Sequence, residues 1–470
     1  MFLRNTALTA LCAGVLVVAP LLMSGSSTKA AAALVILFAP LAIFLALKRP
    51  MLFPYAAYAF LIPFDNLLSV STFGTATRLL GLCAGVALLW WTMRQRRIVS
   101  PPRTLLVCAA LVAWAGLTLV WTSDFSGGLR VFGTILQIML LYAVLSITPI
   151  EVKQIQMVLL AIVGGGFVAA IFGLYIFHHQ SPVQQELQRE LGRLQIQIGE
   201  SAIDVNHFAN ALMLPIAATL VMALNQRRIV AKLFLCGVLA TMIGAVYASA
   251  SREALLGIGA MAVYLAIVSR KRLQLLAVFA LGAFLSVLNP AVWQRFAAAS
   301  ATGGAGRTSI WAVGIAALKA HWLFGSGIGS FTNAYDQAYI GVFQSYPVGW
   351  SRDAHDILLS SSVELGIIGV LLVVTLWVMQ FFMLRRIERG SALYDMRMIC
   401  MAALIGLSLC AFFIDLFTYK YLWLLFALIA QVRSLAVLHS ELAVRPTPVT
   451  IEEDDVADPL WVREAPSHAY

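Results

Sequence analysis

The chain has 470 residues, of which 61% are hydrophobic and only 11% are charged, and its mean hydropathy is +0.88. This usage excludes an ordinary soluble domain and indicates an integral membrane protein. The formal net charge is +10, but no basic, aromatic-rich soluble segment accompanies it, so a nucleic-acid partner is not expected.

Apolar runs recur along the chain, and many reach the length of about 20 helical residues that crosses a bilayer. Residues 158–177 are continuously apolar, whereas barrel strands alternate apolar and polar residues. The sequence therefore predicts an all-α polytopic membrane protein with about 14 transmembrane helices, within a range of about 12 to 14. The spans are expected near residues 7–24, 31–47, 51–64, 77–93, 104–121, 129–147, 155–177, 206–224, 229–250, 252–268, 272–289, 356–383, 396–416 and 419–438.

Basic residues set the expected orientation, because Lys and Arg in short loops stay on the cytoplasmic side. Clusters at 48–49, 94–103, 227–232, 270–272 and 385–389 all fall in alternate connections. We therefore expect both termini in the cytoplasm and two longer connections, 178–204 and 290–355, on the outer face. That outer face is therefore the expected functional face.

Three regions are predicted from these patterns. Residues 1–200 form the N-terminal transmembrane helices, 201–438 form a second transmembrane region with the outer loop 290–355, and 439–470 form a disordered, acidic cytoplasmic tail. Within the loop at about 178–204, Leu187, Leu191, Leu194 and Ile198 have the spacing of an amphipathic helix. Such a helix either covers a lipid substrate as a lid or simply covers the bundle.

Metal and cofactor motifs are lacking in the sequence. The six cysteines lie inside apolar runs without paired ligand spacing, and His178 and His179 have no nearby Cys. No P-loop, dinucleotide fingerprint or nucleophile elbow occurs. We therefore predict no metal site and no cofactor.

Polar residues at the ends of spans are the informative ones. Arg252 follows Ser251 where two apolar segments meet, and an Arg at the bilayer edge needs water, a carboxylate or an anionic ligand. It either binds an anion or pairs with Glu253. Asn206 and His207 begin another span, where Asp204 or Asn206 is also a candidate helix cap.

The outer loop 290–355 carries the strongest candidate for phosphate binding. A helix is expected from about Thr308 to Ala320, with Arg307 at its positive end, where the guanidinium fork matches phosphate oxygens. An exposed Arg in a solvated loop is the alternative. The glycine-rich turn that follows, at 324–330, is a weak phosphate motif because glycines also serve ordinary turns.

Three separated patterns resemble the O-antigen ligase and O-antigen polymerase superfamily. They are Ser251-Arg-Glu-Ala-Leu-Leu-Gly, Gly306-Arg-Thr-Ser-Ile-Trp311 followed by Leu323-Phe-Gly-Ser-Gly-Ile-Gly, and Ala354-His-Asp-Ile-Leu-Leu-Ser-Ser-Ser-Val-Glu-Leu-Gly366-Ile-Ile-Gly369. The segment from Asp204 to His207 also looks like the family. The resemblance runs from about residue 200 to 435, and the N-terminal half matches in hydropathy only.

The resemblance implies a metal-independent glycosyltransferase in the bacterial inner membrane, with its active site toward the periplasm. It would use a glycan on polyprenyl diphosphate as donor, with a lipid A core or another glycan as acceptor. His355, Arg307 and Arg252 match the functional residues of that superfamily, and we expect Arg352, Asn206, His207 and Trp311 to bind substrate. The arginines would stabilise the leaving diphosphate. His355 would act as general base toward the acceptor hydroxyl, or would only orient a substrate.

Several alternatives stay open from sequence. Asp356 either raises the basicity of His355 or turns away, and Arg352 binds phosphate or pairs with Asp353 or Asp356. Glu364, deep in a span, is expected to be structural. The reaction is ligation, repeat-unit polymerisation or protein glycosylation, and the rival classes are a polysaccharide or lipid transporter and a structural subunit.

Overall fold

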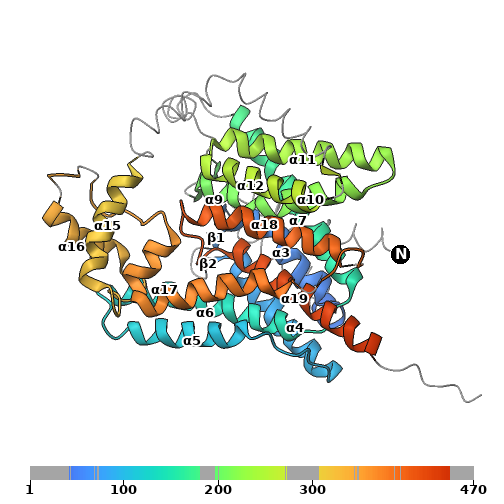
Figure 1. The fold of residues 1–470 in the computed structure, drawn as a ribbon, viewed down its shortest axis with the longest axis horizontal. Helices are drawn as coiled ribbons and strands as arrows, with labels where there is room; N and C mark the ends of the chain where they lie inside the picture. Colours follow the sequence, from blue (N-terminus) through green and yellow to red (C-terminus); the bar gives the residue numbers. More distant parts are fainter. Residues whose placement is uncertain are drawn as a thin grey trace, which may run out of the picture.

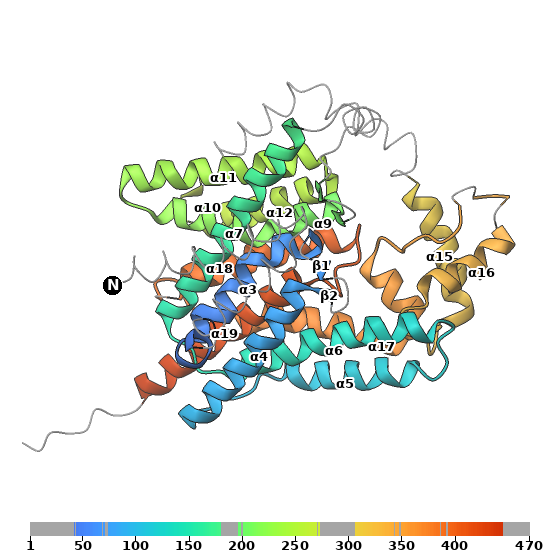
Figure 2. The same ribbon diagram turned by 180° about the vertical axis from the view of Figure 1, so that it is seen from behind.

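The computed structural model describes residues 42, 44–67, 69–70, 74–179, 196–198, 201–269, 271–272, 306–342, 344–346, 349–385, 387–391 and 393–444. Helices make up nearly all of its regular structure (Figures 1 and 2). Two short antiparallel strand pairs, β1–β2 and β3–β4, are the exceptions within the described residues. The predicted helical, polytopic architecture is therefore confirmed in outline.

The N-terminal half begins with a broken apolar segment and continues with long helices. Its elements are η1 (Met51–Ala56), α3 (Ala57–Leu61), η2 (Ile62–Leu67), β1 (Ser69–Val70), β2 (Gly74–Thr75), α4 (Ala76–Gln95), α5 (Thr104–Thr118), α6 (Phe125–Ile147), α7 (Val152–His178) and β3 (Ile196–Ile198).

The C-terminal half carries the remaining long helices and two helices of the predicted outer loop. Its elements are β4 (Ser201–Ile203), α9 (Val205–Ala211), α10 (Met213–Asn225), α11 (Ile229–Ser249), α12 (Arg252–Val268), α15 (Arg307–His321), α16 (Phe331–Val342), α17 (Ile357–Met383), α18 (Tyr394–Ala411) and α19 (Lys420–Val444).

Eight helical segments of the described chain are long and apolar enough to cross a membrane. They correspond to the predicted spans 77–93, 129–147, 155–177, 206–224, 229–250, 356–383, 396–416 and 419–438. The predicted spans 51–64 and 104–121 are shorter apolar helices, and 252–268 is the 17-residue α12. Span 7–24 and most of spans 31–47 and 272–289 lie outside the described residues.

The long helices run side by side, so the bundle has two ends. α9, α12, α15 and α17 begin at one end, toward the left in Figure 1, whereas the connection between α10 and α11 lies at the other. Contacts between distant segments agree with this arrangement. Trp121 Nε1 donates to the Gly325 carbonyl at 3.2 Å at the first end, and Arg433 Nη1 donates to the Ser100 carbonyl at 3.4 Å at the second. We call the first the site end and the second the opposite end.

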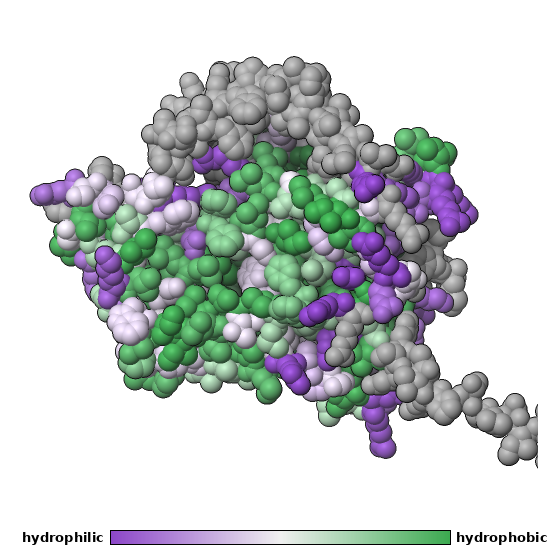
Figure 3. All heavy atoms as spheres, in the orientation of Figure 1, coloured by the Kyte–Doolittle hydropathy of each residue, from purple (hydrophilic) through white to green (hydrophobic). Residues whose placement is uncertain are grey.

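Close helix packing builds the core at the C-terminal side. α12 packs along α18, where a Cβ on Gly257 would lie only 3.0 Å from the Gly406 carbonyl oxygen. α10 is buried between α7, α11 and α18. On the face drawn in Figure 3, apolar residues dominate the middle and hydrophilic residues gather toward the ends, as a membrane-spanning bundle requires.

Two predicted segments differ from the structure near their ends. Ile198, placed in an amphipathic helix, lies in β3, because the alternation of Ile196, Gln197 and Ile198 has the two-residue period of a strand. The rest of that predicted helix lies outside the described residues. α19 continues to Val444, past the expected boundary at 438, and residues 445–470 of the predicted tail are also outside.

Candidate active site

Four helices begin close together at the site end, and the local sequence explains each start. Asp204 caps α9 by accepting the N–H groups of Asn206 and His207 at 2.8 and 3.1 Å. Asp356 caps α17 by accepting the Leu359 N–H at 2.7 Å. Side-chain caps of this kind satisfy donors that the first turn of a helix leaves open.

α12 and α15 begin after residues with left-handed backbone. Ala250, with φ of 50°, ends α11 just before Arg252, and Gly306, with φ of 80°, precedes Arg307. Both conformations turn the chain sharply, so each arginine stands at the positive end of a helix. Helix N-termini of this kind favour anions.

Arg307, at the start of α15, lies close to Glu253, at the start of α12. Its Nη2 is 3.5 Å from Glu253 Oε1, and the two side chains are only 16% and 3% exposed. That separation is long for a hydrogen bond, and Oε1 has no hydrogen-bond partner among the described residues. The guanidinium also lies 5.9 Å from the centre of the Phe413 ring. Glu253 therefore forms its ion pair with Arg307 and not with Arg252. Arg252 and Glu253 are consecutive residues of α12, and consecutive residues on a helix point to different faces.

His355 is held in an unusual conformation directly before α17. Its φ is 49°, a left-handed value that costs a residue other than glycine free energy and that is often found at functional sites. Trp311 Nε1 donates to the carbonyl of Ala354 at 3.1 Å, which ties α15 to the segment carrying the histidine. Trp311 therefore positions His355 through the backbone.

The surroundings of His355 keep its imidazole neutral. Burial and the nearby Arg307 guanidinium lower the pKa of His355 below its ordinary value, while Asp353, Asp204 and Glu253 act in the opposite direction. Burial raises the pKa of Asp356, whose Oδ1 accepts the N–H of Leu359. Of the two open roles for Asp356, the structure thus supports the one in which it turns away to cap the helix. A neutral imidazole retains a nitrogen able to accept a proton.

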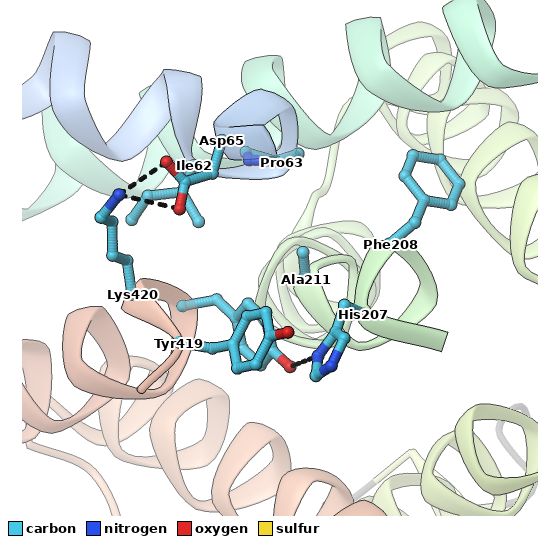
Figure 4. Close-up of a pocket in the computed structure, with 9 residues that line it drawn as sticks. Ile62, Pro63, Asp65, His207, Phe208, Ala211, Tyr419 and Lys420 are labelled. Carbon is cyan, nitrogen blue, oxygen red and sulfur yellow. Dashed lines mark hydrogen bonds and ion pairs between the residues drawn. The ribbon is translucent and has the colours of Figure 1, made fainter. Parts of the chain in front are cut away.

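His207 lies next to this group and joins it to α19. Its Nδ1 is 3.0 Å from the Tyr421 hydroxyl, and its ring stacks on Tyr419 with centroids 3.5 Å apart. Figure 4 shows His207 and Tyr419 facing each other at one side of a small gap, with Asp65 and Lys420 on the other side. The charges of His207 and His355 are close enough to interact.

The other predicted residues are placed as follows. Asn206 is buried beside Asp204 at the start of α9. Arg252 is the first residue of α12, adjacent in sequence to Glu253. Arg352 is exposed and lies against Gly349, where an added Cβ would be 3.3 Å from its Nη2. The structure thus brings His355, Arg307 and His207 together, and Trp311 bonds to the carbonyl just before His355. Arg352 lies instead against Gly349.

The glycine-rich turn is structural. Its backbone N–H groups from Gly325 onward are donated within the protein, from Gly325 to the His321 carbonyl, from Ser326 and Gly327 to carbonyls of α17, and from Ile328 to Thr118 Oγ1. The carboxylate of Glu364, in α17, accepts the backbone N–H groups of Gly329 at 3.0 Å and Phe331 at 3.1 Å. The donors from Gly325 to Phe331 are thus used within the protein and not for phosphate, and the expected structural role of Glu364 agrees with these bonds.

Sequence reasoning missed a polar cluster near His207. Lys420 Nζ lies 2.6 and 2.8 Å from the two Asp65 oxygens and 2.9 Å from the hydroxyls of Thr75 and Thr77. The signal was present, because Lys420 and Arg78 open two predicted spans in which charges are costly. The partner Asp65 is 355 positions from Lys420 in sequence, and no local pattern joins them.

Comparison with known families identifies the central part of the chain. Residues 237–374 match the model of the O-antigen ligase family. Over this region the chain is similar to the O-antigen ligase superfamily, as the sequence patterns predicted. The match includes Arg252, Arg307, Trp311, Arg352 and His355, and it is narrower than the resemblance seen in the sequence, since it omits Asn206 and His207. A search of curated proteins finds no matching relative.

Proposed function

We propose that this chain is a metal-independent glycosyltransferase that moves a glycan from a polyprenyl diphosphate carrier to an acceptor hydroxyl at the outer face of the bacterial inner membrane. The observation that carries the proposal is the grouping of a neutral His355 with the cationic Arg307 in the region that matches the O-antigen ligase family. Base and cation are the two groups that this reaction needs.

The proposed step balances in atoms and charge. The acceptor oxygen attacks the anomeric carbon of the donor, the bond from that carbon to the phosphate oxygen breaks, and the polyprenyl diphosphate leaves with the electron pair. The hydroxyl proton passes to the imidazole of His355. Arg307 and Arg252, at the starts of α15 and α12, would stabilise the charge that grows on the diphosphate, with the helix N-termini adding to the field.

The remaining predicted residues take supporting roles in this proposal. Trp311 holds the backbone before His355, and His207 with Asn206 borders the acceptor side. Arg352 is assigned to the exposed loop, where it would meet a flexible part of the glycan. Among glycan transfers, we favour ligation to a lipid A core, and repeat-unit polymerisation is the alternative.

The test is transfer by the purified full chain in vesicles supplied with a polyprenyl-diphosphate glycan and an acceptor. Arg252→Ala, Arg307→Ala and His355→Ala should each lower the rate by about 100-fold or more, since removing one transition-state contact costs about that much. Arg389→Ala, an exposed change in the connection between α17 and α18, should leave the rate unchanged. Full transfer by all three site variants would rule the mechanism out.

The products distinguish the remaining alternatives. A ligase adds one preformed glycan to each acceptor, whereas a polymerase lengthens the lipid-linked chain. A transporter would move the lipid-linked glycan across the vesicle without breaking its bond to diphosphate, and that outcome would reject the enzyme class.

A further inference from the structure

A second, larger cavity lies beside the candidate active site. It measures about 550 Å³ and is bordered by α4, α6 and the start of α19. Ligand sites for small molecules commonly span roughly 300–1,000 Å³, so the cavity has room for a sugar with a charged substituent. Apart from Gly329, its lining lies outside the region that matches the O-antigen ligase family.

One face of α6 turns polar where it borders this cavity. Arg130, Thr134 and Gln137 recur at steps of three and four residues and all line it, although α6 is a candidate membrane span. From Asp124 to Ile138 the lining extends roughly 20 Å along the helix, at about 1.5 Å per residue. A polar stripe within a span is costly unless it meets water or a polar ligand.

Some of the charged side chains that line the cavity have partners within the protein, and others form no ion pair. Lys420 is paired with Asp65, and Asp124 accepts the Gly127 N–H at 2.9 Å and the Ser126 hydroxyl at 3.0 Å. Those bonds lower the pKa of Asp124 and keep it ionised as the cap of α6. Within the described part of the chain, the two cavity arginines, Arg78 and Arg130, form no ion pair within 4 Å, although the charge of Arg130 contributes to lowering the pKa of Asp124.

Arg78 is oriented without being neutralised. Its Nε donates to Gln137 Oε1 at 2.9 Å, and Gln137 Nε2 returns a bond to the Arg78 carbonyl at 2.8 Å. A neutral amide fixes the guanidinium but leaves its charge. Arg130 donates only a 3.4 Å bond to the Ser126 carbonyl. An oriented guanidinium with a second one in the same cavity is suited to a phosphate or carboxylate.

The cavity is connected to the candidate active site through one aromatic ring. Tyr419 stacks on His207 and also lines the cavity. The small gap of Figure 4 shares Asp65, Tyr419 and Lys420 with it. The charge of His355 interacts with those of Arg307 and His207, His207 stacks on Tyr419, and Tyr419 lines the cavity.

We propose that this cavity binds an anionic sugar of the acceptor glycan, one that bears a phosphate or a carboxylate. The assignment to the acceptor rests on the proposed function: if the diphosphate lies at Arg307 and Arg252, a general base at His355 must face the acceptor on its other side. That side leads through His207 and Tyr419 to the cavity. Thr134 donates its hydroxyl to the Arg130 carbonyl and Gln137 bonds to Arg78, but the Thr134 oxygen can still accept and Gln137 Nε2 carries a second N–H, so both can meet the hydroxyl groups of a sugar.

A binding experiment tests the cavity independently of transfer. Saturation-transfer NMR of the full chain in detergent would use glucose 6-phosphate, glucuronate and glucose as probes. Both charged sugars should bind more tightly than glucose, and Arg130→Gln and Arg78→Gln should each weaken their binding by about ten-fold or more. Arg103→Gln, at the opposite end, and His355→Ala should leave binding unchanged. These last results would hold even if the proposed transfer reaction were wrong.

Several results would overturn the inference. Equal binding of glucose, unchanged binding in Arg130→Gln, or loss of binding in His355→Ala would each do so. Arg78 also holds Gln137, so its variant is judged only if its melting temperature is retained, and Arg130→Gln decides the question otherwise. In transfer assays, Arg130→Gln should raise the KM for a charged acceptor about ten-fold and leave the donor KM unchanged. An increase confined to the donor KM would assign the cavity to the carrier and reject the acceptor.

Discussion

His355 combines a strained backbone with an imidazole kept in its neutral form. The left-handed φ of 49° is stabilised by the helix cap at Asp356 and by the bond from Trp311 to Ala354. Burial and Arg307 lower its pKa, whereas Asp353 and Glu253 oppose that shift. The pKa of His355 therefore depends on the charges around it, and a change in one of those charges should change that pKa.

The pH dependence of transfer follows from the direction of that shift. A general base works only when neutral, so the midpoint of the acidic fall in rate should lie below about pH 6.5, the ordinary histidine pKa. Asp353→Asn removes a negative charge that favours the imidazolium. The pKa of His355 should then fall further, and the acidic limb of the pH–rate profile should move to lower pH.

Asp395→Asn provides the matched control, because Asp395 is exposed at the start of α18, away from the site. Its profile should overlay that of the unmodified chain. A shift of the acidic limb to higher pH in Asp353→Asn would contradict the proposed electrostatics.

At this scale the sequence predicted part of the site. Arg307 and His355 could be chosen because their patterns resemble a family and because charges near apolar runs need a reason. The role of Asp356 could not be chosen, since capping depends on the rotamer that its backbone allows. The pairing of Glu253 with Arg307 joins two helices 54 positions apart and leaves no local pattern.

At the scale of elements, α17 and the glycine-rich turn form one structural unit. Gly366 interrupts α17 with φ of 65° and ψ of −167°, a combination open essentially to glycine. The Ile367 N–H then bonds to the Trp322 carbonyl at 2.9 Å, and Glu364 accepts the N–H of Gly329 in the turn and that of Phe331 just after it. Two sequence patterns that look separate are thus the two halves of one packed joint.

Glu364→Gln tests that joint. The carboxylate accepts one N–H at each oxygen, whereas a glutamine side chain offers only one accepting oxygen. One buried donor loses its partner, at a cost of about 1–3 kcal/mol, so the melting temperature in detergent should fall. An unchanged melting temperature would show that the turn does not depend on Glu364.

Packing of α12 against α18 can be tested with two glycines of the same helix. A Cβ at Gly257 would lie 2.9 Å from Cys410 Sγ, so Gly257→Ala should overpack the interface and cost about 1–3 kcal/mol. Gly259 has nothing within 4 Å of such an atom, and Gly259→Ala should be neutral or stabilise the helix by about 0.5–1 kcal/mol. Equal thermal stability of the two variants would contradict the packing described.

At the scale of the whole molecule, the candidate catalytic residues lie at one end of the bundle. The starts of α9, α12, α15 and α17 meet at the site end, and the N-terminal half adds a charged cavity beside them. Hydropathy predicted the helices because each must satisfy its own backbone in lipid. It could not predict the cavity, because Arg78, Arg130 and Lys420 meet only after α4, α6 and α19 pack together.

The orientation of this bundle is the last prediction from sequence, and it rests on basic residues such as Arg227 and Arg228 in short loops at the opposite end. In a background with the six cysteines replaced by alanine, Ser345→Cys lies in an exposed turn after α16, and Asn225→Cys lies at the end of α10. A membrane-impermeant maleimide added to spheroplasts should label the first and reach the second only after permeabilisation. The reverse pattern would put His355 on the cytoplasmic face, where an outer-face glycan transfer is impossible.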